Sequence, residues 1–153
     1  MDNVQNPEHG RLLLCQLAEL RDNARLCDVT LVAEGARISA HRVVLAATTD
    51  YFKAMFTNNM AESDSNTIEL KGVEATALEA LINFCYYGKI RISSTNVWSV
   101  LPTACLLQLN EVKVFEAVAD WVRFDQPARQ QLYPQTFSVG VVLGVIKAIS
   151  REN

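Results

Sequence analysis

The stretch that decides the fold runs from Cys27 to Phe56 and reads CDVTLVAEGARISAHRVVLAATTDYFKAMF. In its first half Val29, Leu31 and Ile38 are apolar, and Gly35 sits where the chain must reverse, so the pattern predicts two short strands joined by a tight turn. The second half carries apolar residues three and four positions apart, which predicts helix. These residues are Val43, Val44, Ala46, Ala47, Tyr51, Phe52, Met55 and Phe56.

Asp28 and the adjacent pair His41 and Arg42 each have apolar neighbours in the sequence. An ionisable side chain in apolar surroundings is costly unless it is paired. We therefore expect Asp28 and Arg42 to be partners in a partly buried charged pocket, with His41 nearby.

The segment resembles the BTB (POZ) domain, in the version found in the Kelch-like family. The resemblance rests on blocks that follow one another as in the family: Cys27–Val29, Ala40–Ala47, Tyr51–Phe56, Leu78–Gly88, Asn96–Val97 and Leu101–Leu109. It implies an α+β fold with a small, mostly antiparallel sheet flanked by a cluster of helices. The residues expected inside are Val29, Leu31, Val44, Leu45, Leu78, Leu81 and Ile82.

Bulk properties limit the classes of function. At 153 residues, half of them apolar, the chain suits one domain or one domain with an appendage. A net charge of −3 argues against non-specific binding to a nucleic acid. There is no run of 18 apolar residues, so we expect no membrane span, and the polar start MDNVQNPEHG is not that of a secretory signal.

The cysteines and histidines give no support to a metal centre or to catalysis. Cys15, Cys27, Cys85 and Cys105 form no CxxC pair, which makes zinc improbable, and no cofactor is expected. We interpret all four as small buried hydrophobic residues in a reducing compartment, the cytosol or the nucleus. No nucleophile elbow, phosphate-binding loop or paired carboxylates appear, so we do not expect an enzyme.

A first helix is predicted from about Arg11 to Asn23. It displays Leu12, Leu13, Leu17 and Leu20, which need an apolar partner surface. Core packing and a dimer interface both satisfy that need. The resemblance favours the dimer, because in the family this helix packs across the dimer axis.

Four further elements are expected towards the C-terminus. Thr67–Leu70 alternates as a strand, and a helix from about Ala75 to Tyr87 is ended by Gly88. A short strand is expected around Arg91, between Ile90 and Ile92. A helix from Asn96 to about Leu107 contains Pro102, where we expect a kink or a break.

The segment Met60-Ala61-Glu62 follows the helix that ends near Phe56. It is either an ordinary polar loop or the hydrophobic-x-Glu motif with which Kelch-like proteins help to bind the scaffold cullin-3. The resemblance favours the motif, in which Met60 fills an irregular pocket and Glu62 adds a charge-assisted hydrogen bond. The same resemblance places Tyr51, Leu107 and Asn110 beside that surface.

Beyond Val112 the sequence departs from the family. Residues 114–123 resemble a late helix of the BACK domain, most of which is missing at this junction. An internal deletion such as exon skipping would produce the junction, as would an artefact in joining coding segments. We therefore expect a flexible N-terminus (1–10), a BTB domain (11–113), a BACK-derived helical fragment (114–133) and an apolar tail (134–153), with no Kelch repeat.

Three functions of different classes remain open. The first is the BTB module of a cullin-3 ubiquitin-ligase adaptor, which dimerises and binds cullin-3. The second is a regulatory or dominant-negative partner that dimerises with related BTB proteins without binding cullin. The third is a transcriptional BTB module that binds a corepressor. The sequence has no Cys and His spacing of a zinc finger that would support this third function.

Overall fold

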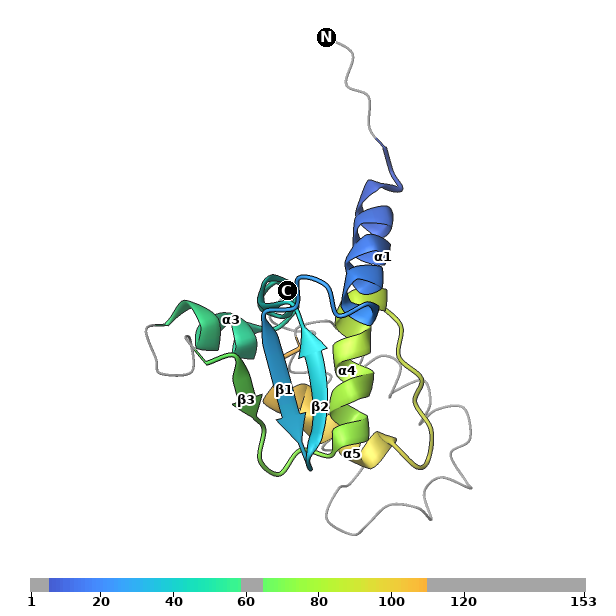
Figure 1. Cartoon of the computed structure of the whole chain (residues 1–153). Helices are drawn as coiled ribbons and strands as arrows, with labels where there is room; N and C mark the ends of the chain where they lie inside the picture. The colour runs from blue at the N-terminus through green and yellow to red at the C-terminus, as the bar shows by residue number, and fades with distance from the viewer. Residues whose placement is uncertain (1–5, 59–64, 110–153) are drawn as a thin grey trace.

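A computed structural model describes residues 6–58 and 65–109 and has an α+β fold (Figure 1). The elements, in chain order, are α1 (His9–Asp22), β1 (Val29–Ala33), β2 (Ala36–Ala40), α2 (Arg42–Thr48), α3 (Asp50–Thr57), β3 (Thr67–Glu69), α4 (Ala75–Tyr87) and α5 (Val97–Leu106). No helix in these two ranges is both long enough and apolar enough to cross a membrane.

The strands form a mixed three-stranded sheet in the order β2-β1-β3. β1 and β2 are an antiparallel hairpin in which Ala33 pairs with Ala36, while β1 and β3 run parallel. The two turn residues, Glu34 and Gly35, both have positive φ (48° and 81°), as the tight turns that match strand twist require. The sequence predicted this hairpin but not the parallel pairing, because β1 and β3 are far apart in the chain.

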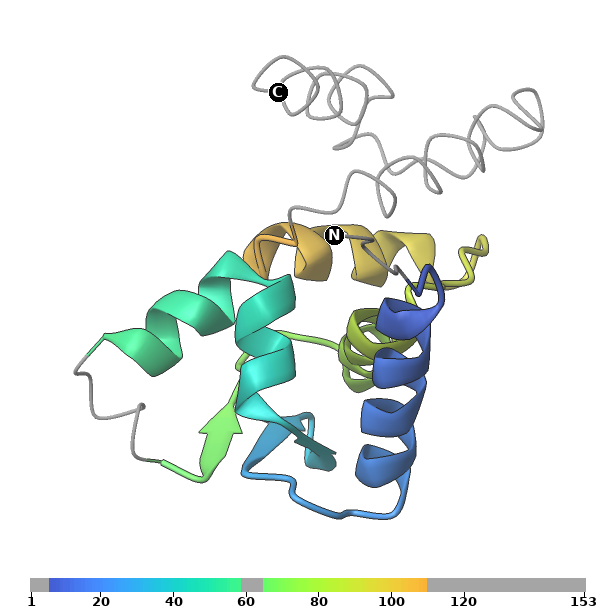
Figure 2. The same ribbon diagram turned by 90° about the horizontal axis from the view of Figure 1, so that it is seen from above.

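The predicted helical stretch after β2 consists of two helices, α2 and α3. Thr49 is extended (φ −135°, ψ 132°) and separates α2 from α3. Its hydroxyl accepts a hydrogen bond from the Phe52 backbone N–H at 3.2 Å, which caps the start of α3. The break lets α2 and α3 form a bent pair beside the sheet, seen from above in Figure 2. Val43, which belongs to the predicted apolar pattern, is exposed on α2.

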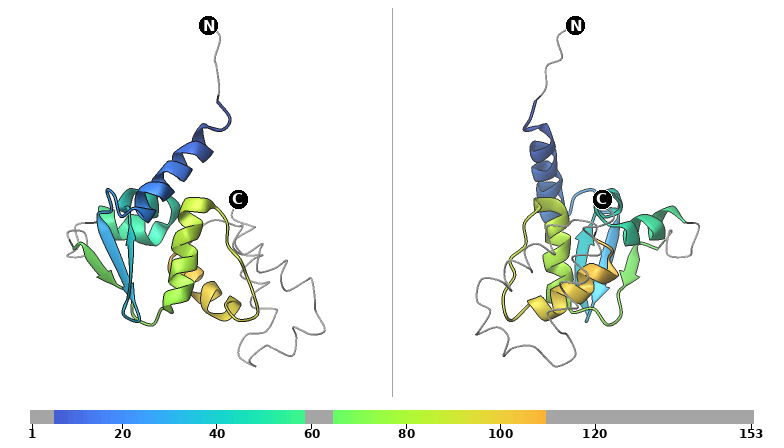
Figure 3. Two further views of the ribbon diagram at one scale, coloured as in Figure 1. Left: turned by 45° about the vertical axis from the view of Figure 1, so that its right-hand side comes forward. Right: turned by 180° about the vertical axis from the view of Figure 1, so that it is seen from behind.

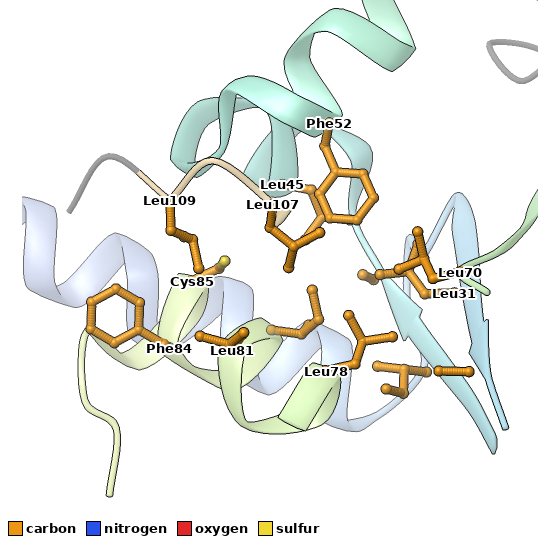
Figure 4. Packing of buried hydrophobic residues seen from close by; sticks show 14 of the residues in the cluster. Leu31, Leu45, Phe52, Leu70, Leu78, Leu81, Phe84, Cys85, Leu107 and Leu109 are labelled. Atoms are coloured by element: carbon orange, nitrogen blue, oxygen red, sulfur yellow. The ribbon is translucent and has the colours of Figure 1, made fainter. Parts of the chain in front are cut away.

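α4 forms the centre of the core. Its buried residues come from most of its circumference, and Gly88 ends it in the left-handed conformation (φ 62°), as the sequence predicted. Figure 4 shows Leu78, Leu81 and Cys85 of α4 packed among side chains from the sheet, α2, α3 and the chain after α5. All seven residues expected inside the domain are buried, which confirms that part of the fold prediction.

The chain between α4 and α5 does not form the predicted strand. Ile90 and Ile92 pack against the core, but the backbone around them is hydrogen-bonded to the side chain of Asn96. The Asn96 side chain donates to the Arg91 carbonyl (2.9 Å) and accepts from the Ser93 N–H (2.8 Å). A local asparagine therefore takes the place of a strand partner.

We expected a kink or a break at Pro102, and the break does not occur, because α5 is continuous across this residue. A proline inside a helix costs about 3 kcal/mol. Val97, Val100 and Ala104 are buried on the same helix, and we attribute the continuity of α5 to their packing.

We predict that Leu81→Ala lowers the free energy of unfolding by about 2–5 kcal/mol, because Leu81 is fully buried and truncation leaves a cavity. Urea denaturation followed by circular dichroism measures the change. Leu106→Ala is the matched control, since Leu106 is a helical leucine that is 45% exposed. Equal losses for the two variants would contradict the prediction.

Candidate interaction site

Asp28 and Arg42 are neighbours, but they do not form the expected buried carboxylate–guanidinium pair. Asp28 is exposed and Arg42 is half-buried. The Arg42 backbone N–H donates to the Asp28 carboxylate (Oδ1, 2.7 Å), while its side-chain Nε donates to the Asp28 backbone carbonyl at 3.3 Å. Arg42 is the first residue of α2, and its backbone N–H has no partner within the helix. The Asp28 carboxylate accepts a hydrogen bond from this N–H at the positive end of the helix dipole.

His41 is the buried member of the expected pocket, and its polar atoms are satisfied by neutral groups. Its Nε2 lies 2.9 Å from the Arg25 carbonyl oxygen, and its Nδ1 lies 2.9 Å from the Tyr86 hydroxyl. A carbonyl only accepts, so in the neutral imidazole the ring proton is on Nε2 and Nδ1 accepts from Tyr86. The same hydroxyl accepts from the His41 backbone N–H at 2.9 Å.

Tyr86 suits this role because its hydroxyl stays protonated. Burial raises the pKa of Tyr86 to about 12, so its hydroxyl remains protonated well above neutral pH. Sequence reasoning had no signal for this pairing, because Tyr86 fits the apolar pattern of α4 and lies 45 residues from His41.

Arg21 connects α1 to the same cluster and was also missed. Its guanidinium carbon lies 5.0 Å from the centre of the Tyr86 ring. Its Nη1 donates to the Asn83 side chain at 2.7 Å, and its Nε donates to the Ser39 carbonyl at 3.1 Å. The C-terminal half of α1 is therefore fixed to α4 and β2.

The N-terminal half of α1 extends away from the body of the domain, as two separate views in Figures 1 and 3 show. Leu12 is 48% exposed, Leu13 53% and Leu14 40%. Leu17 and Leu20 are half-buried, and Leu17 packs against the core of its own domain. The expected four-leucine stripe is thus divided between the exposed end of α1 and the domain.

Leu14 belongs to the exposed set although the spacing rule did not select it. Consecutive residues are about 100° apart around a helix, so three in a row cover roughly 200° of its circumference. The exposed apolar surface of α1 is therefore broad, and it is formed by Leu12, Leu13 and Leu14.

A surface hollow of about 420 Å³ lies between α3 and β3. We call it the α3–β3 groove, and it is lined by Tyr51, Met55, Ser65, Thr67, Ile68, Glu69 and Lys71. Tyr51 packs edge-on against the buried Phe52, with ring centres 5.2 Å apart. Tyr51 and Met55 are half-buried, so each keeps part of its surface available to a partner.

The structure separates the residues expected to contact cullin-3. Tyr51 lines the groove. Leu107 is fully buried beneath α2 and α3 and cannot present its side chain to a partner, so the expectation of a surface leucine is wrong for that residue (Figure 4). Met60, Glu62 and Asn110 lie outside the described residues.

The cysteines differ from the expectation of uniform burial. All four are free thiols, but Cys15 and Cys105 are exposed, Cys27 is intermediate and Cys85 is buried. Desolvation raises the pKa of the Cys27 and Cys105 thiols, which favours their less reactive protonated form.

Comparison with known families agrees with this architecture. A family model described as "BTB/POZ domain" matches residues 17–116, well over half of the chain. The chain belongs to the BTB/POZ domain family. A BTB domain is a protein-interaction module, so the exposed leucines of α1 and the α3–β3 groove are the surfaces to consider for partners.

Kelch-like proteins are among the curated relatives of this BTB domain. Kelch-like protein 2 of Homo sapiens is 47% identical over 108 residues, which cover 71% of this chain and 18% of the relative. Kelch-like protein 2 of Rattus norvegicus is 46% identical over the same shares. The chain therefore spans less than a fifth of the length of these relatives.

A solved structure titled "BTB domain of zebrafish PATZ1" superposes on this BTB domain with a TM-score of 0.71. The superposition covers 82% of this chain and all of the other, at 23% sequence identity. A likeness at that identity shows the fold alone, and it supports the arrangement of sheet and helices described above.

We predict that Asp28→Ala lowers the free energy of unfolding by about 0.5–2 kcal/mol, the cost of losing a helix cap. A buried ion pair would lose about 3–5 kcal/mol instead. Asp28→Asn keeps an acceptor oxygen for the Arg42 N–H and should lose less than Asp28→Ala. Thermal melts of both variants measure the difference, and a loss above 3 kcal/mol for Asp28→Asn would restore the buried-pair interpretation.

Proposed function

We propose that this chain is a non-enzymatic, dimeric adaptor module that binds the N-terminal region of cullin-3 beside α3. The observation that carries the proposal is the α3–β3 groove, where α3 presents Tyr51 and Met55. The chain that leaves α3 at Thr57 leads directly into the segment with Met60 and Glu62. The family resemblance assigns the cullin contact to that segment.

The chemistry of this region suits a protein partner. Aromatic and flexible apolar side chains anchor interfaces because they bury much area at little entropic cost. Tyr51 and Met55 are of this kind, and Ile68 lies beside them in the groove. Exposed Glu69 and Lys71 supply charges at its border, as in an interface whose centre is apolar and whose rim is polar.

Dimerisation is the second part of the proposal, and α1 supports it. Three leucines that are 40–53% exposed form an unusually apolar surface for a helix in water. Burying a whole leucine side chain is worth about 1.5–3 kcal/mol, so the exposed fractions of three leucines per chain give a substantial driving force for association. A second copy of the same helix offers the complementary surface that a two-fold interface requires.

The alternative is a regulatory partner that dimerises through α1 and does not bind cullin. The exposed leucines favour it, because they support dimerisation independently of the α3–β3 groove. Such a chain would pair with related BTB proteins and alter their assembly.

We predict that placing Asp at both Leu12 and Leu13 converts the dimer to a monomer, because charges would replace the apolar contact. Light scattering coupled to gel filtration at micromolar concentration measures the mass. Leu106→Asp is the matched control, as an equally exposed leucine on α5, and it should remain dimeric. A monomeric wild type would contradict the dimer proposal.

We predict that wild-type dimer binds a cullin-3 N-terminal fragment in calorimetry and that Met60→Ala/Glu62→Ala weakens binding at least tenfold, since interface anchors typically contribute about 2 kcal/mol or more each. Glu79→Ala, which removes an exposed glutamate of α4, is the control for charge and should bind as wild type does. No heat from folded wild-type dimer would favour the regulatory partner. Equal affinity of wild type and double variant would place the cullin contact elsewhere.

A further inference from the structure

Arg42 reaches three parts of the chain with one side chain. Its guanidinium carbon lies 4.9 Å from the centre of the Phe56 ring, in the last turn of α3. Its Nη2 donates to the Ser65 carbonyl, just before β3, and its Nε donates to the Asp28 carbonyl at 3.3 Å. These three side-chain contacts are to one aromatic ring and to two backbone oxygens.

Phe56 and Ser65 stand on either side of the connection between α3 and β3. Phe56 stacks on the fully buried Phe52, with ring centres 5.6 Å apart. On the other side, the carbonyl of Asn66 accepts from the Thr30 N–H of β1 at 2.8 Å. Each end is thus anchored to its own element, and Arg42 contacts both ends.

We propose that Arg42 is a positioning residue for the partner-binding surface beside α3, because it fixes the separation between the end of α3 and the start of β3. This inference rests on the proposed binding of cullin-3 at the α3–β3 groove, whose lining includes Ser65. Binding at a groove whose two walls are loosely held costs additional ordering entropy, and walls that are already held reduce that cost. Arg42 therefore raises affinity without being a contact residue itself.

The geometry requires arginine instead of a simple positive charge. A planar guanidinium lies flat on an aromatic ring while its N–H groups donate in the same plane to carbonyl oxygens. A lysine ammonium at the end of a flexible stem cannot cover the Phe56 ring and donate to both the Ser65 and Asp28 carbonyls. Arg42→Lys keeps the positive charge and removes the planar guanidinium. This variant therefore distinguishes a role in positioning from a role of the charge alone.

The first test uses hydrogen–deuterium exchange on the free 153-residue chain, without cullin. In Arg42→Lys, amides at the end of α3 and in β3 should exchange about fivefold faster or more, because these segments open locally, while amides of α4 keep the wild-type rate. Arg37→Lys is the matched control, at an exposed arginine of β2, and should leave all rates unchanged. Wild-type rates around β3 in Arg42→Lys overturn the inference, as does loss of the cooperative thermal transition, which would make Arg42 a general stability residue.

The second test is calorimetry against the cullin-3 N-terminal fragment. Arg42→Lys should bind roughly tenfold more weakly than wild type, because only a fraction of the free chain would have α3 and β3 correctly placed. Arg37→Lys should bind as wild type does. Full affinity of Arg42→Lys would show that charge alone is needed and overturns the positioning role. Absence of binding by wild type refutes the cullin proposal, whereas the exchange experiment still decides whether Arg42 holds the two ends together.

Discussion

The buried hydrogen bonds between His41 and Tyr86 fix the point at which sheet and helices meet. His41 follows β2 and precedes α2, and Tyr86 lies near the end of the central helix α4. One hydroxyl serves both the backbone N–H and the Nδ1 of His41, and the remaining ring nitrogen is met by the Arg25 carbonyl. No buried side-chain nitrogen or oxygen in the described ranges lacks a hydrogen-bond partner, so this polar cluster carries no desolvation penalty of the kind that unpaired groups incur.

The cluster also determines the direction of α1. Arg21 covers the Tyr86 ring and donates to Asn83 and Ser39, and the Tyr87 hydroxyl donates to Asp22 at 2.9 Å. These contacts all involve the C-terminal end of α1. The helix is therefore held at one end only, and its leucines at 12, 13 and 14 extend beyond the domain (Figure 3).

The sequence was sufficient for the features that depend on local pattern. The β1–β2 hairpin, the apolar faces of α4 and the end of α4 at Gly88 follow from periodicity and turn chemistry, and the structure agrees with them. The break at Thr49 also has a local signal, because a threonine followed by an aspartate is a common helix start. At Pro102 the expected break does not occur, because tertiary packing along α5 outweighs the tendency of proline to interrupt a helix.

The candidate site was harder to derive because its decisive contacts join residues that are distant in sequence. Asp28 and Arg42 were correctly placed side by side, but charge alone suggested an ion pair where the backbone N–H of a helix start was the partner. Leu107 matched a block of the family yet lies inside the core, since a block match does not tell which side of a helix end faces the solvent. Leu14 was missed because spacing rules select one face, whereas the exposed end of α1 is apolar over much of its circumference.

Two adjacent residues, His41 and Arg42, connect to the two regions that we propose for partners. The N-terminal end of α1 and the elements α3 and β3 lie on opposite sides of the domain in Figures 1 and 2, so the two regions are separate. His41 reaches the α1 side through Tyr86 and Arg21, and Arg42 reaches the α3 side through Phe56 and Ser65. The start of α2 thus supports both regions without contributing to the surface of either. A substitution of His41 or Arg42 would therefore alter partner binding from outside the contact area. The interpretation of these residues as a simple charged pocket leaves out this supporting role.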